Sequence, residues 1–164
     1  MPSDGKGGYS AIQILLHWLI ALLVLFQLLF GESIGMVLRA ERRGTVPDPS
    51  DVTLANFHYW VGITILVLVM LRILMRLSFG APPSAGGSAM SELAAKVTHG
   101  LFYLLLVVTP VTGLLAFYAG EPFGDIHELA KPVFIVLIVL HALAALWHQF
   151  WLKDGTLRRM VVPG

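Results

Sequence analysis

The residues of this 164-residue chain that are best suited to chemistry are its six histidines. Three of them, His127, His141 and His148, lie in the segment IHELAKPVFIVLIVLHALAALWHQFW, which is otherwise apolar enough to lie in a bilayer. An imidazole can bind a metal ion, form hydrogen bonds or titrate near neutral pH. Because polar groups are costly inside a membrane, histidines in such a segment indicate function by default.

The spacing of these three histidines separates them into two kinds. His127 and His141 are fourteen residues apart, which on an α-helix places them within about 40° of one face and about 21 Å apart along the axis. His141 and His148 are seven residues apart, which corresponds to about 10.5 Å. Two bulky cofactors fit the first spacing, whereas the second would bring them nearly into contact.

Two more histidines lie at matching depths. His17 lies a turn or two inside the start of the first apolar segment, and His58 lies just inside the start of the second. Because successive segments cross in opposite directions, His17 and His141 should lie toward the inner side, and His58 and His127 toward the outer side. An iron porphyrin held between two helices requires one imidazole from each side. The pattern makes these four histidines candidate iron ligands of two haems.

Other interpretations of the histidines stay open. A single membrane histidine can be an interhelical hydrogen-bonding group or an interfacial residue. Zinc also binds imidazole, but it needs three or four ligands at one depth, and the apolar segments contain no carboxylate to complete such a site. The chain has no cysteine, which excludes disulfides, thiolate-held iron–sulfur clusters and covalently attached c-type haem.

The composition indicates the elements that must position these residues. Hydrophobic residues make up 57% of the chain, charged residues 13%, and the mean hydropathy is +0.79, so this is an integral membrane protein. Four stretches without Asp, Glu, Lys or Arg are long enough to cross about 30 Å of hydrocarbon as helices. We expect an all-α fold, a four-transmembrane-helix bundle that forms a single domain over residues 1–164. Its helices are expected near residues 9–30, 52–77, 92–119 and 125–152.

The connections and the charges predict the topology. The stretch SFGAPPSAGGSAMS reads as a flexible cytoplasmic connection, and a short helix is expected near residues 36–43. Basic residues favour cytoplasmic termini, with seven on the side of the termini and four on the other. The seven are Lys6, Arg72, Arg76, Lys96, Lys153, Arg158 and Arg159, and the four are Arg39, Arg42, Arg43 and Lys131. A net charge of +1 without a basic tract gives no indication of a nucleic-acid partner.

Four segments resemble, in order, the helices of the bacterial cytochrome b561 family, which is related to the cytochrome b subunits of nickel–iron hydrogenases and formate dehydrogenases. They are YSAIQILLHWLIALLVLFQLLFG, HYWVGITILVLVMLRILMRL, HGLFYLLLVVTPVTGLL and LHALAALWHQFWLKDGTLRRM. The resemblance covers nearly the whole chain, and the closing HQFWLKDGTLRRM is its most specific part. It implies ligands on helices one, two and four, which correspond to His17, His58, His127 and His141.

The resemblance also implies a function. It implies a di-haem b protein of the bacterial inner membrane, in contact with lipid, that moves electrons between an outer donor and the quinone pool. Some members oxidise superoxide and reduce ubiquinone, which makes superoxide:ubiquinone oxidoreductase one candidate activity. An alternative is a membrane-anchor relay subunit that takes electrons from a docked dehydrogenase or a soluble redox protein. A third is a haem-free metal transporter or assembly protein.

The start of the last helix decides how His127 is placed. If Asp125 and Glu128 of the DIHE motif cap an early start, His127 is helical. If Pro132 is instead the first helical residue, His127 lies on a loop, and helix geometry no longer fixes its distance from His141.

Other polar residues could act near the inner haem. His148 is a candidate proton donor to quinone, or else an interfacial residue. His99 could hydrogen-bond a haem propionate or a quinone, or join two helices. Arg72 and Arg76 could pair with propionates, or extend to the lipid phosphates. Two glycines, Gly62 and Gly113, are expected to allow close packing of a helix or a porphyrin.

Overall fold

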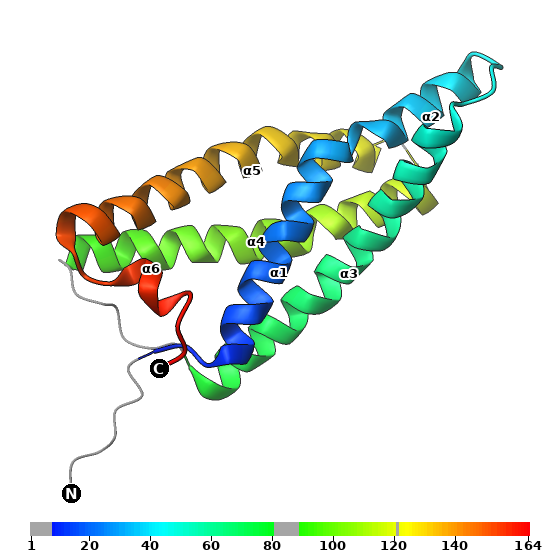
Figure 1. Ribbon diagram of the computed structural model, residues 1–164. Coiled ribbons are helices and arrows are strands. Elements are labelled where there is room, and N and C mark those ends of the chain that lie inside the picture. Colours follow the sequence, from blue (N-terminus) through cyan, green and yellow to red (C-terminus); the bar gives the residue numbers. More distant parts are fainter. Residues whose placement is uncertain (1–7, 81–88, 121) are drawn as a thin grey trace, which may run out of the picture.

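The all-α membrane bundle predicted from the sequence is confirmed (Figure 1). The computed structural model describes residues 8–80, 89–120 and 122–164, and most of the expected flexible connection lies outside them. Within the described residues, four helices are long and apolar enough to cross a membrane. They are α1 (Ala11–Phe30), α3 (Pro49–Phe79), α4 (Ala89–Ala119) and α5 (Pro122–Trp147). The same residues also form the shorter α2 (Glu32–Arg42), the π-helical turn η1 (His148–Leu152) and α6 (Thr156–Arg159).

Side-chain caps define where two of the long helices begin. At the start of α1, the hydroxyl of Ser10 accepts from the Gln13 amide at 3.3 Å, and the Gln13 side chain accepts from the Ser10 amide at 3.0 Å. This reciprocal pair is a capping box. At the start of α3, the Asp48 carboxylate accepts from the Ser50 amide at 2.8 Å, and Pro49 occupies the first helical position.

The last long helix starts earlier than either sequence interpretation required. Helix α5 begins at Pro122, so His127 is helical and Pro132 lies inside the helix. Both alternatives for its start are wrong, because Asp125 lies in the first turn of a helix that has already begun and Pro132 lies inside that helix. Proline is favourable at the first helical position, where its missing N–H costs nothing.

The short helix α2 is also longer than expected and starts sooner. It follows α1 after the single residue Gly31, whose backbone is itself in the right-handed helical region. Figure 1 shows that α1 and α2 run on as one bent rod, and that α2 projects beyond the bundle beside the start of α3. We call this end of the molecule the loop end.

The long helices pack in two layers that meet near the loop end (Figure 1). Helix α4 lies along α5, α1 and α2 lie against α3, and α3 also contacts α4. Large apolar side chains in the middle of each helix remain exposed, including Leu22, Val67, Leu104 and Leu140. Exposed apolar side chains on every helix are what a lipid environment requires.

The buried core forms an apolar layer between two levels of histidines. Its members are Ile20, Val24, Ile65, Val69, Leu106, Ala130 and Phe134. On α5, for example, Phe134 falls between His127 and His141, and on α4 Leu106 follows His99. The polar groups of the two levels are therefore separated by packed hydrocarbon.

The chain folds back after α5 at the opposite end, which we call the terminal end. Lys153 and Gly155 adopt left-handed backbone conformations, with φ of 53° and 75°, and these reverse the chain into α6. The indole of Trp18 then donates to the carbonyl of Met160 at 2.7 Å, and the backbone amide of Gly164 donates to the carbonyl of Tyr9 at 3.3 Å. Both ends of the described chain thus meet beside the start of α1.

Candidate functional site

Two histidines from facing helices meet near the loop end. The rings of His58 in α3 and His127 in α5 have centroids 5.8 Å apart and are nearly perpendicular, at 82°. We call them the loop-end pair. Two imidazoles that bind one metal through bonds of about 2 Å have centroids about 6 Å apart. The observed separation is close to that value.

A hydrogen bond fixes the proton of one ring in this pair. The Nδ1 atom of His127 lies 2.9 Å from the carbonyl oxygen of Thr109 in α4. Because a carbonyl can only accept, Nδ1 carries the proton, and Nε2 keeps the lone pair that a metal requires. A Cβ atom on Gly113 would lie only 3.0 Å from the His127 ring. The glycine therefore allows His127 to approach α4 closely enough to make this bond.

The other ring of the pair has a buried nitrogen without a protein partner. Among the described residues, the buried side-chain atoms that lack a hydrogen bond are His58 Nδ1, Gln27 Oε1 and Thr109 Oγ1. All three belong to the loop-end level of the bundle. A buried polar group left without a partner costs about 1–3 kcal/mol, and such groups commonly mark a functional site.

Three histidines gather at the terminal end. His141 of α5 contacts His17 of α1 at a centroid distance of 6.5 Å and His99 of α4 at 5.5 Å. Phe102 packs against the same ring at 5.3 Å. We call the three histidines the terminal-end trio. The structure thus brings His17 to His141, as the depth argument predicted, and adds His99 as a second neighbour.

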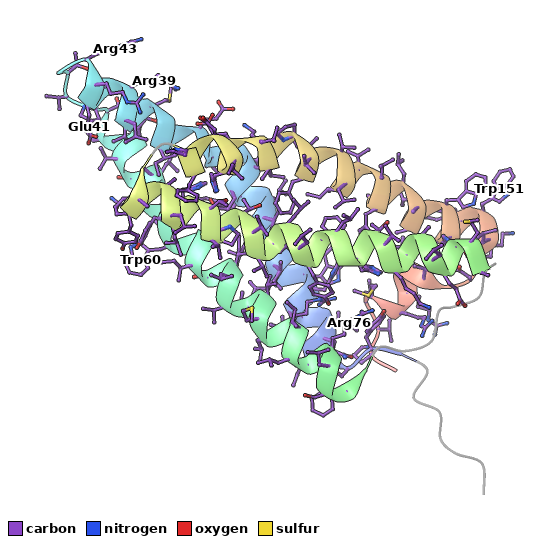
Figure 2. The ribbon with its side chains drawn as sticks, turned by 180° about the vertical axis from the view of Figure 1, so that it is seen from behind. Arg39, Glu41, Arg43, Trp60, Arg76 and Trp151 are labelled. Carbon is purple, nitrogen blue, oxygen red and sulfur yellow. The ribbon has the colours of Figure 1, made fainter. Side chains whose placement is uncertain are left out.

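The two arginines predicted at this end are turned toward the neighbouring helices. Arg72 donates to the carbonyl of Gln13 at 2.9 Å, and the Arg76 guanidinium lies 5.9 Å from the centre of the Tyr103 ring. Together with Tyr9 and Gly80, these residues line a small recess of about 20 Å³. Figure 2 shows Arg76 at the base of the bundle, near the end of α3.

His148 lies apart from the trio and has a carboxylate partner that the sequence interpretation missed. Its Nδ1 atom is 2.5 Å from Oδ2 of Asp154. The other carboxylate oxygen accepts from the Thr156 amide at 3.0 Å and from its hydroxyl at 2.6 Å. Burial opposes ionisation of Asp154, but the hydrogen bonds from Thr156 and His148 outweigh it and lower the pKa of this carboxyl below its ordinary value. The sequence HQFWLKDGT places these residues close together, but their contact depends on the π-helical turn and the chain reversal.

The facing imidazoles of the loop-end pair fit the two axial ligand positions of a haem iron. In the part of the chain that the structure describes, no group of three or more His, Cys, Asp or Glu side chains is placed to hold a metal alone. The loop-end pair instead offers two facing imidazoles, one with its tautomer fixed and one with a buried unpaired nitrogen. Paired axial ligands are what a haem iron needs from a protein.

The loop end also carries charged groups near its surface. Figure 2 shows Arg39, Glu41 and Arg43 at the projecting tip of α2. At the start of the same helix, the Glu32 carboxylate lies 2.5 Å from the amine of Lys131 in α5, and the two side chains are 78% and 40% exposed. An ion pair this exposed contributes little to stability. Mixed charges at the tip make electrostatic attraction of an anion weak.

A membrane bundle that brings histidines from facing helices together at two depths has the architecture of a b-type cytochrome. Residues 8–163 match the prokaryotic cytochrome b561 family, and the chain belongs to that family. It is therefore a multi-pass bacterial membrane protein of electron transfer, and the family implies haem b as its cofactor.

Several relatives match over almost their full length. The chain is 38% identical to "Cytochrome b562" of Cereibacter sphaeroides, with 95% of this chain and 96% of the relative covered. It is 35% identical to "Probable superoxide oxidase CybB" of Yersinia pestis, with 93% and 95% covered. It is 28% identical to "Cytochrome b561 homolog 2" of Escherichia coli, with 93% and 90% covered.

Proposed function

We propose that this protein binds two b-type haems and transfers electrons from a donor at the loop end to a quinone at the terminal end. His58 and His127 would hold one haem, and His17 and His141 the other. The observation that carries the proposal is the presence of facing imidazoles at two levels, with the apolar core between them. When bound, the haems would supply one-electron chemistry at each level.

The orientation follows from the basic residues. Seven of them belong to the terminal side and four to the loop side, so we place both termini in the cytoplasm of a bacterial inner membrane. The donor would then approach from the outer face. The similarity to "Probable superoxide oxidase CybB" makes superoxide the first donor to test.

Quinone reduction needs protons as well as electrons, and the terminal end has groups that could deliver them. Reducing one quinone to a quinol consumes two electrons and two protons, so two superoxide ions would be converted to two O₂ for each quinol formed. His148 is our candidate proton donor, because Asp154 holds its Nδ1 edge at the end of the bundle that we place in the cytoplasm. His99, Arg72 and Arg76 would stabilise the propionates or the quinone at the same end.

Kinetics on the purified protein test this function. When superoxide is mixed with oxidised protein and ubiquinone, the haem absorption bands should change to those of the reduced form. One quinol should be produced for every two superoxide ions consumed. A protein that ignores small donors but is reduced by a docked redox protein would be a relay subunit instead. A purified protein without Soret or alpha bands would support the haem-free alternative.

A single substitution tests the proton route separately. His148→Ala should keep both haem spectra yet slow reoxidation by quinone about tenfold or more, since general acid catalysis contributes about 10²- to 10⁴-fold. Trp151→Phe is the control, because Trp151 is exposed at the same end. Loss of a haem in His148→Ala would make His148 a ligand, and unchanged kinetics would leave it structural.

A further inference from the structure

A buried glutamine lies beside the loop-end pair. Gln27 is in α1, and its Nε2 atom donates to the backbone carbonyl of His58 in α3 at 2.8 Å. Its Oε1 atom is buried and finds no partner within the described residues. A Cβ atom on Gly62 would lie 3.4 Å from the amide nitrogen, so the amide lies directly against the α3 backbone. One half of this polar group is paired, and the acceptor half is not.

The His58 ring turns its unpaired nitrogen toward the same part of α1. A Cβ atom on Gly31 would lie 3.1 Å from His58 Nδ1. The amide of Gly31 donates to the backbone carbonyl of Gln27 at 2.9 Å, which closes the last turn of α1. The Nδ1 atom of His58 therefore lies over the turn that begins with Gln27.

The second ring of the pair has the same arrangement with its hydrogen bond made. The Nδ1 edge of His127 lies against Gly113, and it donates to the carbonyl of Thr109, four residues earlier in α4. Gln27 likewise precedes Gly31 by four residues. Each imidazole thus rests on a helical turn closed by a glycine. For His58, the backbone carbonyl in the equivalent position is that of Gln27, which already accepts from the Gly31 amide, whereas the side-chain Oε1 of Gln27 is buried without a partner.

We infer that Gln27 is a positioning residue for His58, whose Nδ1 proton it accepts through Oε1, directly or through one water, while its Nε2 holds the His58 backbone. The inference rests on the proposed function, in which Nε2 of His58 binds iron. A metal-binding histidine nearly always donates its other ring N–H to a fixed acceptor. Most buried polar groups in proteins form a hydrogen bond, either directly or through an ordered water.

This hydrogen bond would affect the iron as well as the ring. An acceptor on Nδ1 makes the imidazole a more basic ligand, which favours the oxidised iron and lowers the reduction potential. Removing the acceptor should therefore raise the potential of the haem held by the loop-end pair. A role limited to packing would not predict a direction.

Two substitutions at Gln27 separate the acceptor from the donor. Gln27→Leu removes both halves of the amide, whereas Gln27→Glu removes the donor and keeps an acceptor oxygen. We expect Gln27→Leu to shift the potential of the loop-end haem upward and to increase its loss to a haem acceptor by about 10- to 100-fold. Gln27→Glu should retain this haem and shift its potential downward. The other haem serves as the internal reference, and Leu29→Met, on the exposed face of the same helix, is the control.

The outcomes distinguish this inference from the proposed function. If Gln27→Leu changes neither the reduction potential nor the retention of the loop-end haem, the inference is overturned. The acceptor for His58 Nδ1 would then be the backbone carbonyl of Gln27. If Gln27→Leu does not assemble, an upward or absent shift in Gln27→Glu would overturn it equally. If His58→Ala loses no haem, the proposed ligand set itself is wrong.

Discussion

The two histidine sites of this protein differ in the hydrogen bonding of the polar groups near them. At the loop end, two imidazoles face each other, with the Nδ1 edge of His58 against Gly31, between α1 and α2, and that of His127 against Gly113 in α4. The buried atoms that lack partners in the described part of the chain all lie there. At the terminal end, three imidazoles meet, and this end also contains the hydrogen bonds of Trp18 with Met160 and of His148 with Asp154.

This difference indicates two kinds of site in one bundle. The loop-end pair is held by close helix contacts and carries unmet hydrogen-bonding capacity, which suits a fixed cofactor ligand. The terminal-end trio offers His141 two neighbours and lies at the same end of the bundle as the hydrogen-bonded pair His148 and Asp154. Such surroundings suit an exchange of both electrons and protons with a small molecule.

The largest effect is expected from removing either histidine of the loop-end pair. We expect His127→Ala and His58→Ala each to lose one of two low-spin haems, because an iron left with one axial imidazole is held weakly. Absorption and electron paramagnetic resonance spectra should show the other haem unchanged. Retention of both haems with wild-type spectra in His127→Ala would remove His127 from the ligand set.

A second pair of substitutions decides the ligand of the terminal-end trio. His17→Ala should lose the haem at this end, whereas His99→Ala should keep it with a shifted potential, because we assign His99 to a hydrogen bond. Haem content and redox titration measure both effects. If His99→Ala loses the haem and His17→Ala keeps it, His99 is the iron ligand. Its ring lies nearer to that of His141 than the ring of His17 does.

The close contact at Gly113 gives a smaller, graded effect. In Gly113→Ala, the new Cβ would lie 3.0 Å from the His127 ring, so the ring must move by a few tenths of an ångström and strain its bond to Thr109. We expect about tenfold weaker haem retention, at the lower end of the range for a disturbed second shell. Gly100→Ala on the same helix meets no atom within 4 Å and is the matched control. Equal retention in the two variants would contradict the proposed fit.

The smallest expected effect is a pH-dependent loosening of the terminal end. The lowered pKa of Asp154 means that the ionised carboxylate stabilises the fold. This contribution is complete above the ordinary carboxyl pKa and is lost as the pH falls through the lowered value. The protection factor of the Thr156 amide, which compares its exchange rate with the intrinsic rate at the same pH, should therefore fall in acid, and Asp154→Asn should show a low protection factor already at neutral pH. A wild-type protection factor that does not change with pH would rule out this role.

The class of fold could be predicted from the sequence, but several side-chain contacts at the histidine sites could not. Hydropathy predicts membrane helices because lipid leaves the backbone no other partners. Helix spacing also anticipated that His58 meets His127 and that His17 meets His141, while their ligand roles stay predictions. The start of α5 was missed, because a proline can begin a helix or lie within one.

Contacts across the bundle were harder to foresee. The bond between His148 and Asp154 requires a chain reversal through left-handed residues, which no periodicity reveals. The role we infer for Gln27 depends on which face of α1 meets α3. The position of one polar residue in an apolar helix does not predict which face of the helix packs against its neighbour.

The number of haems in the purified wild-type protein is the most direct test of the proposal that each histidine level binds one haem. Haem extracted and quantified against total amino-acid content should give two b-type haems per chain. A redox titration of the same sample should resolve two low-spin components, one for each histidine level. A single haem in fully loaded protein would contradict the two-site account, since one of the two histidine levels would then have no iron to bind.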